Sequence, residues 1–268
     1  MIKVGVCGCG TIGSYLINVI LKKYSNCICL VGVSETNPES LKSLSSSLKK
    51  KMLNFSLEEL VRKSDLIIEA AHASVVPELL ELVIKHKKQV MLMSVGGVLT
   101  KRGLFEKIKD NKIKMYIPSG AIAGLDALKA ARMGKIKSVK LTTRKPVAGL
   151  IGAPYLMKNK INLKSIKKDK VVFSGSALKA VECFPKNINV AAILSLAGLG
   201  ATKTKVCIVA SPITKRNTHT IEIKGDFGTI LTCTENVPSK LNPKTSMMAI
   251  LSALATLDGI MSNLKIGT

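Results

Sequence analysis

Three glycines near the start of the chain have the spacing of a phosphate-binding loop. Gly8, Gly10 and Gly13 form the pattern G-x-G-x-x-G, between an apolar run at Ile2 to Val6 and an amphipathic stretch at Ser14 to Leu21. In such a loop the first glycine allows a tight turn, the second lets a pyrophosphate approach the backbone, and the third lets a helix pack on the strand. The N-terminus of that helix then favours negative charge. The pattern predicts a strand, turn and helix that bind a dinucleotide.

An acidic residue follows at the expected distance. A second apolar run, Ile28 to Val33, leads to Glu35, which lies 22 positions beyond Gly13 (35 − 13). The dinucleotide fold places near this point the acid that binds the ribose hydroxyls of the adenosine. A carboxylate there favours NAD, because it repels the 2′-phosphate of NADP. Thr36, Asn37 and nearby lysines leave the use of NADP open.

The first half of the chain alternates between strand and helix patterns. We expect apolar strands at residues 65–71, 89–95 and 114–117, with helices at 74–86 and 104–108. Ser56 and Glu59 have the spacing of a capping box. Continuous apolar strands separated by helices indicate a parallel sheet covered on both faces. We therefore predict an α/β fold with a Rossmann-type doubly wound sheet, which binds its ligand at the carboxyl ends of the strands.

The second half has a different pattern. We expect helices at 176–183 and 190–199, and antiparallel strands at 205–211 and 219–234 with a hairpin turn at 225–228. The predicted domains are 1–122 for dinucleotide binding and 123–244 for a substrate and catalytic α+β domain with an antiparallel sheet. A C-terminal helix within 245–268 is expected to pack back on the first domain.

Composition limits the class of protein. The chain has 41 basic and 17 acidic side chains, a net charge of +24. Such a charge suggests nucleic-acid binding, but aromatic residues, on which single-stranded bases stack, make up only 3%. No apolar run reaches the roughly 18 residues of a membrane span, and Met1 leads directly into the first predicted strand. We expect a cytoplasmic protein that binds neither nucleic acid nor membranes.

Seven cysteines raise the question of a metal site. Cys7 and Cys9 form one C-x-C pair, and Cys27 and Cys29 form another. Neither pair has the C-x-x-C and histidine spacing of a zinc site. We expect no metal and interpret the cysteines as small apolar side chains in a reducing compartment.

Three later segments, together with the glycine loop, resemble the L-aspartate dehydrogenase family. They are PSGAIAGLDA at 118–127, FPKNINVAA at 184–192 and NTHTI at 217–221. The resemblance covers nearly the whole chain and keeps the order of all four motifs. It implies oxidative deamination of L-aspartate with NAD or NADP. The product is iminoaspartate, which hydrolyses to oxaloacetate and ammonia or feeds NAD biosynthesis. It also implies a homodimer.

The resemblance assigns roles to individual residues. The family's catalytic histidine matches His219, and its nicotinamide-proximal residues match Ala123 and Asn189. An imidazole that titrates near neutrality suits the proton transfers of deamination. The residues expected to contact the cofactor are Gly8, Gly10, Thr11, Ile12, Gly13, Glu35, Ala71, His72, Ala123 and Asn189.

The two carboxylates of L-aspartate need cationic or amide partners. Arg144, Lys145 and Lys186 are the candidates, and Arg144 has the fork geometry for bidentate binding. Other readings stay open. A homoserine dehydrogenase or dihydrodipicolinate reductase type of enzyme has a similar architecture, and an NAD-binding sensor without activity would carry the same glycine loop.

Overall fold

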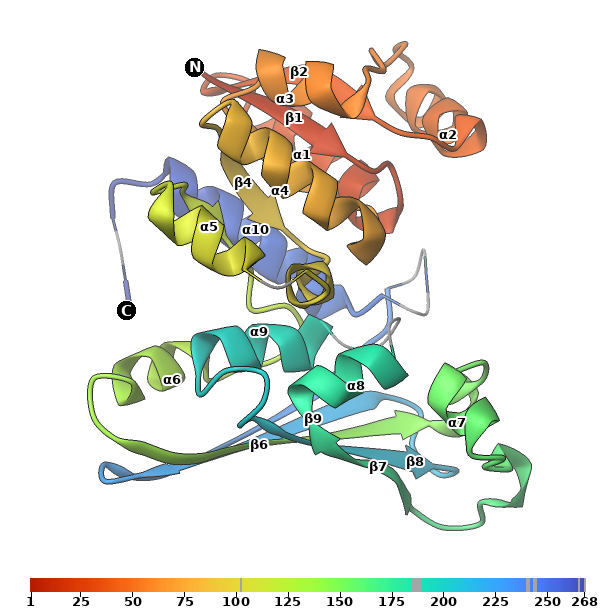
Figure 1. Ribbon diagram of the computed structural model, residues 1–268. Helices are drawn as coiled ribbons and strands as arrows, with labels where there is room; N and C mark the ends of the chain where they lie inside the picture. The colour runs from red at the N-terminus through yellow and green to blue at the C-terminus, as the bar shows by residue number, and fades with distance from the viewer. Residues whose placement is uncertain (102, 185–188, 240–241, 243–244, 265, 268) are drawn as a thin grey trace. The chain divides into compact units, whose positions relative to one another are not determined.

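The computed structural model describes residues 1–101, 103–184, 189–239, 242, 245–264 and 266–267. The chain divides into two compact units, which Figure 1 shows by colour along the sequence. One comprises Met1–Pro118 and Ile250–Asn263, and the other comprises Ser119–Ala249 and Leu264–Thr268. Each unit has a five-stranded sheet of its own.

The first unit contains the predicted parallel sheet. Its strands are β1 (Ile2–Cys7), β2 (Ile28–Ser34), β3 (Leu66–Glu69), β4 (Gln89–Leu92) and β5 (Met115–Tyr116). Their order is β2-β1-β3-β4-β5, and every neighbouring pair is parallel. The strand order reverses between β1 and β3, which makes the carboxyl edge there the binding position of this fold. The prediction of a Rossmann-type sheet is confirmed.

Helices cover both faces of this sheet. They are α1 (Thr11–Lys23), α2 (Pro38–Leu48), α3 (Leu57–Lys63), α4 (Val76–Lys85), α5 (Leu104–Asp110) and α10 (Met247–Met261), with 3-10 turns η1 (Ala73–Val75) and η2 (Val95–Leu99). Leu16 of α1 and Leu257 of α10 share a core cluster with Val4 and Val6 of β1. On the opposite face α3 packs closely on β1 at Gly5. A Cβ at Gly5 would lie only 2.8 Å from the Leu60 side chain, so the absence of a side chain allows this contact.

Local signals account for the helix starts. Ser56 and Glu59 form the predicted capping box at α3. Helix α2 lies in a serine- and lysine-rich stretch that was not among the predicted elements. Its start has a mechanism nonetheless, since the Asn37 side chain accepts from the Glu39 N–H and Pro38 occupies the first turn.

The second unit has a mixed sheet rather than a purely antiparallel one. Its strands are β6 (Ile136–Pro146), β7 (Lys170–Ser176), β8 (Lys205–Ser211), β9 (Asn217–Gly225) and β10 (Gly228–Asn236). The order is β10-β9-β6-β8-β7. The predicted β9–β10 hairpin is present, but β8 runs parallel to β6. The long excursion between them allows a crossover, which a parallel pair requires.

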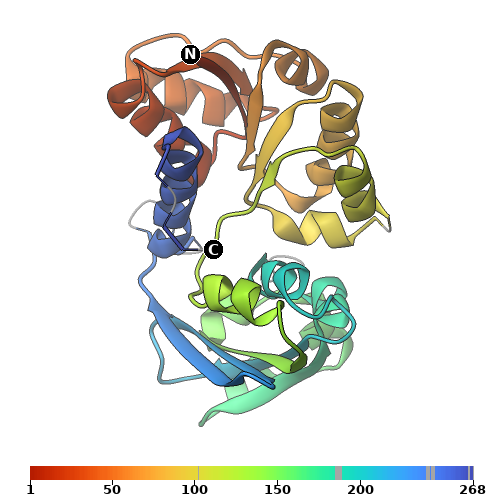
Figure 2. The same ribbon diagram turned by 90° about the vertical axis from the view of Figure 1, so that its left-hand side faces the viewer.

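One face of this second sheet is covered by helices. The helices of the unit are α6 (Leu125–Ala131), α7 (Pro154–Lys158), α8 (Ala177–Cys183) and α9 (Asn189–Ala197), with 3-10 turns η3 (Val147–Leu150) and η4 (Leu163–Ser165). Figures 1 and 2 show α6, α8 and α9 along one face, and among the described residues no helix lies on the other. Alternation along β6 follows this arrangement: Leu141, Thr143 and Lys145 are buried, whereas Lys140 and Arg144 are exposed.

Within the described part of the chain, no helix has the length and apolar character needed to cross a bilayer.

Candidate active site

The glycine loop assigns a different task to each of its glycines. Gly8 has φ +96°, and a Cβ there would lie 2.7 Å from the Ala70 carbonyl oxygen. A Cβ at Gly13 would collide with the Gly8 carbonyl. Gly10, the N-cap of α1, has φ −69° and ψ −166°. A Cβ at Gly10 would meet nothing within 4 Å. The fold therefore needs Gly8 and Gly13, whereas the space at Gly10 is available to a ligand.

Helix α1 begins at this loop, and the backbone N–H groups of its first turn are potential hydrogen-bond donors. Thr11 and Ile12 are the first two helical residues and are partly exposed. Ser14 is already tied into the helix, since its N–H donates to the Gly10 carbonyl oxygen over 2.9 Å. Free N–H groups at a helix start attract phosphate oxygens. A pyrophosphate fits this loop in space and in charge.

Glu35 lies against the same loop. The Cys9 N–H donates to Glu35 Oε2 over 2.6 Å, and the Asn37 N–H donates to Oε1 over 2.8 Å. Asn54 holds the Glu35 backbone from the other side, accepting from its N–H and donating to its carbonyl oxygen, each over 3.0 Å. The carboxylate is thus fixed beside the phosphate loop, where ribose hydroxyls can donate to it. Asn54 was not among the predicted site residues, because no local pattern links it to a partner 19 residues away.

Ala71 and His72 follow β3 at the same edge of the sheet. The Ala71 N–H donates to Glu69 Oε1 over 2.8 Å, and His72 is the residue before the η1 turn. The Gly8 turn packs directly on this segment, because a Cβ at Gly8 would lie 2.8 Å from Ala71 Cα. Both predicted residues therefore lie next to the glycine loop within the first unit.

The cysteines near this loop are protonated thiols. Burial raises the pKa of Cys7 to about 12, with a further rise from the nearby carboxylates of Glu69 and Glu35. The pKa of Cys9 is also raised to about 12, mainly by burial and further by the negative charge of Glu35. A protonated thiol is a poor metal ligand. Among the described residues no three His, Cys, Asp or Glu side chains are grouped as a metal site would need.

The second unit places its predicted cofactor residues at two helix starts. The Ala123 carbonyl oxygen accepts from Thr232 Oγ1 over 3.1 Å, and the Ala121 carbonyl oxygen accepts from Thr234 Oγ1 over 2.9 Å. The 121–124 turn before α6 is thereby tied to β10. Asn189 is the first residue of α9 and is exposed.

His219 is buried on the covered face of the second sheet. It lies directly opposite Thr143 in the β6–β9 register, and its Nδ1 is 3.0 Å from Thr143 Oγ1. The His219 residue is only 5% exposed and Lys145 only 8%. Thr143 was not among the predicted site residues. It is 76 residues from His219 in the sequence, and only the strand register places the two side by side.

Burial changes the pKa values of both ionisable side chains in this group. Burial, with the positive charge of Lys145, lowers the pKa of His219 to about 3. Burial lowers the pKa of Lys145 to about 8. The expectation of an imidazole that titrates near neutrality is therefore wrong, because burial disfavours the imidazolium. At neutral pH the imidazole is uncharged, and the amine is charged but easily deprotonated. When Nδ1–H donates to Thr143, Nε2 carries a lone pair that can accept a proton.

Of the other two candidates for carboxylate binding, Arg144 does not join this group. Arg144 lies on the opposite face of β6 from Thr143 and Lys145, because side chains alternate along a strand. Its guanidinium Nε is 2.9 Å from Asp169 Oδ2. Lys186 lies outside the described residues.

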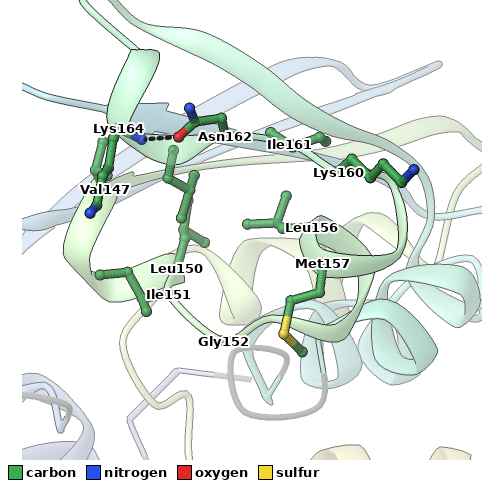
Figure 3. Close-up of a pocket in the computed structure, with 11 residues that line it drawn as sticks. Val147, Leu150, Ile151, Gly152, Leu156, Met157, Lys160, Ile161, Asn162 and Lys164 are labelled. Atoms are coloured by element: carbon green, nitrogen blue, oxygen red, sulfur yellow. Dashed lines mark hydrogen bonds between the residues drawn. The ribbon is translucent and has the colours of Figure 1, made fainter.

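The second unit also contains an apolar cavity of about 430 Å³. Figure 3 shows Leu150, Ile151, Leu156 and Met157 around it, with Lys160 at its rim. All lining residues lie between 147 and 164, so the cavity contains neither His219 nor Lys145.

Each of the two units contains a region that matches a known protein family. Residues 126–260 match the family model "Aspartate dehydrogenase, C-terminal", and residues 8–118 match "Homoserine dehydrogenase, NAD binding domain". The chain is 42% identical to an L-aspartate dehydrogenase of Methanosarcina barkeri and 43% identical to one of Methanocella arvoryzae, each with 100% of both chains covered.

Solved structures confirm the fold. The aspartate dehydrogenase of Thermotoga maritima has a TM-score of 0.77 at 24% identity, with 100% of both chains covered. A hyperthermophilic archaeal homoserine dehydrogenase in complex with NADPH has a TM-score of 0.58 at 12% identity, covering 98% of this chain and 99% of that one. At these identities the structures show the shared architecture alone. The family follows from the sequence relatives and the C-terminal family model: this chain belongs to the L-aspartate dehydrogenase family.

Proposed function

We propose that this protein catalyses the NAD(P)-dependent oxidative deamination of L-aspartate, and that iminoaspartate or its hydrolysis products, oxaloacetate and ammonia, are released. The observation that carries the proposal is the buried His219–Thr143–Lys145 group in a chain with full-length L-aspartate dehydrogenase relatives. A neutral imidazole has a nitrogen lone pair that can accept a proton, and a buried amine is suited to a carboxylate.

We propose cofactor contacts within each unit. We assign the pyrophosphate to Gly8, Gly10, Thr11, Ile12 and Gly13, the adenosine ribose to Glu35, and the nicotinamide half to Ala71, His72, Ala123 and Asn189. The cofactor, when bound, supplies the hydride acceptor. Residues 1–122 with the C-terminal helix within 245–268 would form the cofactor domain, and residues 123–244 the substrate and catalytic domain.

His219 would move the protons of the reaction. The substrate amine must lose a proton as hydride leaves Cα, and the water that hydrolyses the imine must lose another. Nε2 of a neutral His219 would accept each proton when the carboxylates of the bound substrate offset the charge of Lys145 and stabilise the imidazolium. Thr143 fixes the ring through Nδ1. Lys145 would bind one substrate carboxylate through a charge-assisted hydrogen bond.

We also propose a homodimer, built on the uncovered face of the second sheet. Strand pairing aligns a row of uncharged residues across that face, made of Cys233, Thr220, Thr142, Cys207 and Ser174. Two such flat faces can pack sheet on sheet about a twofold axis. A cytoplasmic location is part of the proposal, supported by seven free cysteines, which are typical of a reducing compartment.

The overall reaction is tested by following NADH or NADPH formation with L-aspartate and L-homoserine, and NADH or NADPH consumption with dihydrodipicolinate. We expect turnover with L-aspartate and a higher kcat/KM for NAD than for NADP, because the fixed Glu35 carboxylate repels a 2′-phosphate.

Glu35→Ser should shift the ratio of kcat/KM values toward NADP, whereas the control Glu39→Gln, on exposed α2, should leave this ratio unchanged. A wild-type preference for NADP would contradict the role of Glu35, and NADH binding without turnover would indicate a sensor.

The space at Gly10 predicts a separation between folding and cofactor binding. Gly10→Val should keep the circular dichroism spectrum and melting temperature of the wild type, because a Cβ there meets no protein atom and φ is ordinary. It should lose NADH binding in a fluorescence titration and, with it, turnover. Gly13→Ala is the matched control and should lose stability as well. A folded Gly10→Val protein with wild-type NADH affinity would refute the pyrophosphate site.

Removing the imidazole should affect the chemical step. His219→Ala should lower kcat by roughly 10²-fold or more, the usual contribution of a positioned acid–base group. NADH affinity should change little. Thr143→Val should give a smaller decrease, and His86→Ala, at the end of α4, should leave kcat unchanged. Near-normal turnover by His219→Ala would remove the assignment.

The buried amine predicts opposite effects on substrate binding and stability. Lys145→Met should raise the KM for L-aspartate about tenfold or more, and the wild-type KM should rise as the pH passes through about 8. The folded-state pKa is lowered, so the cost of the buried charge is full below that pH. It disappears above about 10.4, the ordinary value for lysine. The variant should therefore melt higher than the wild type at neutral pH but not at strongly alkaline pH. A wild-type KM that is constant across this range would contradict the role.

Charge on the uncovered sheet face should break the dimer. Thr142→Arg with Thr220→Arg places two cations in the middle of the uncharged row, and light scattering should then report a monomer. Ser43→Arg, on exposed α2, is the control. An unchanged mass for the double variant would place the interface elsewhere.

A further inference from the structure

Glu69 is the only carboxylate that the structure buries among the described residues, with 0% exposure. It ends β3, at the carboxyl edge of the first sheet. Burying an ionised carboxylate is costly unless donors satisfy it. The hydrogen bonds of Glu69 must therefore offset the cost of its burial.

Its hydrogen bonds join two loops. Glu69 Oε1 accepts from the Ala71 N–H over 2.8 Å, while Oε2 accepts from the Ser94 N–H over 2.8 Å and the Met93 N–H over 3.2 Å. Ala71 follows β3, and Met93 and Ser94 follow β4. Burial raises the pKa of Glu69, and the Ser94, Ala71 and Met93 donors oppose that rise.

The two loops pack on each other and on the glycine loop. A Cβ at Gly97 would collide with the Ala73 carbonyl oxygen, and Ser94 Oγ donates to the Ala71 carbonyl oxygen over 3.4 Å. The Gly8 turn lies against Ala70 and Ala71. One carboxylate therefore links the backbone next to the phosphate loop to the backbone beyond β4.

The strand order says which part of the cofactor these loops face. Glu35 follows β2 and the glycine loop follows β1, so the proposed adenosine ribose and pyrophosphate positions occupy one side of the edge. The rest of the dinucleotide must extend across β3 and β4, the next strands in the order. The loops held by Glu69 are those at the nicotinamide half.

We infer that Glu69 is a positioning residue that fixes the 70–73 and 93–97 loops for the nicotinamide half of the cofactor. This inference rests on the proposed cofactor site. Glu69 touches no reacting atom. It acts through the backbone of Ala71, Met93 and Ser94.

The test compares NADH with ADP-ribose, which lacks the nicotinamide. Glu69→Gln is nearly isosteric but turns an amide N–H₂ toward backbone donors, so one loop must lose its acceptor. NADH affinity and kcat should each fall about tenfold or more, and ADP-ribose affinity should stay within about twofold. Wild-type NADH affinity in the variant, or equal losses for both ligands, would overturn the inference. Wild-type turnover of L-aspartate is measured separately and tests the proposed function itself.

A control separates positioning from stability. Ser64 is also fully buried, and its Oγ donates to the Leu60 carbonyl oxygen over 2.7 Å at the other end of β3. Ser64→Ala should lower the melting temperature without changing NADH affinity. If Glu69→Gln does not fold, hydrogen exchange on the wild type decides. NADH should slow exchange in both 70–73 and 93–97, ADP-ribose should slow it in neither, and any other pattern refutes the role.

Discussion

The close approach of three backbones is the constraint on which the first unit depends. The turn at Gly8 lies against β3 at Ala70 and Ala71, and α1 lies against the same turn at Gly13. Without side chains at these points, the helix start can sit over the end of β1 and direct its free N–H groups outward. The rest of the cofactor edge is built around this contact: Glu35 bonds to the loop at Cys9, and the β3 loop packs beside it.

Buried ionisable groups distinguish both candidate sites from the surrounding cores. Glu69 in the first unit, and Lys145 and His219 in the second, are each buried. Placing such groups in the interior opposes folding. Glu69 is compensated by backbone donors from two loops, whereas His219 gives up its charge altogether, with its pKa lowered to about 3. Perturbed ionisable groups of this kind concentrate at functional sites.

The second sheet uses its two faces for different purposes. Helices cover the face that carries Thr143, Lys145 and His219, and the resulting burial sets the protonation of the proposed catalytic group. The other face carries Arg144, paired with Asp169, and the uncharged row on which the proposed homodimer would be built. A shift of one residue in the β6 register would exchange these two sets, so register is as important to the proposed site as residue type.

Local patterns in the sequence determined much of this protein. The glycine spacing, the alternation of strands and helices, the capping box at Ser56 and the β9–β10 hairpin all depend on residues close together in the chain, and each is present in the structure. The sequence motifs also indicated the L-aspartate dehydrogenase family, to which the chain belongs. The tertiary structure alone decided the parallel pairing of β8 with β6, the partnership of Thr143 with His219, the inward direction of Lys145 against the outward one of Arg144, and the link that Glu69 makes between two loops. These depend on strand register and on contacts between distant segments, which no local pattern of residue types encodes.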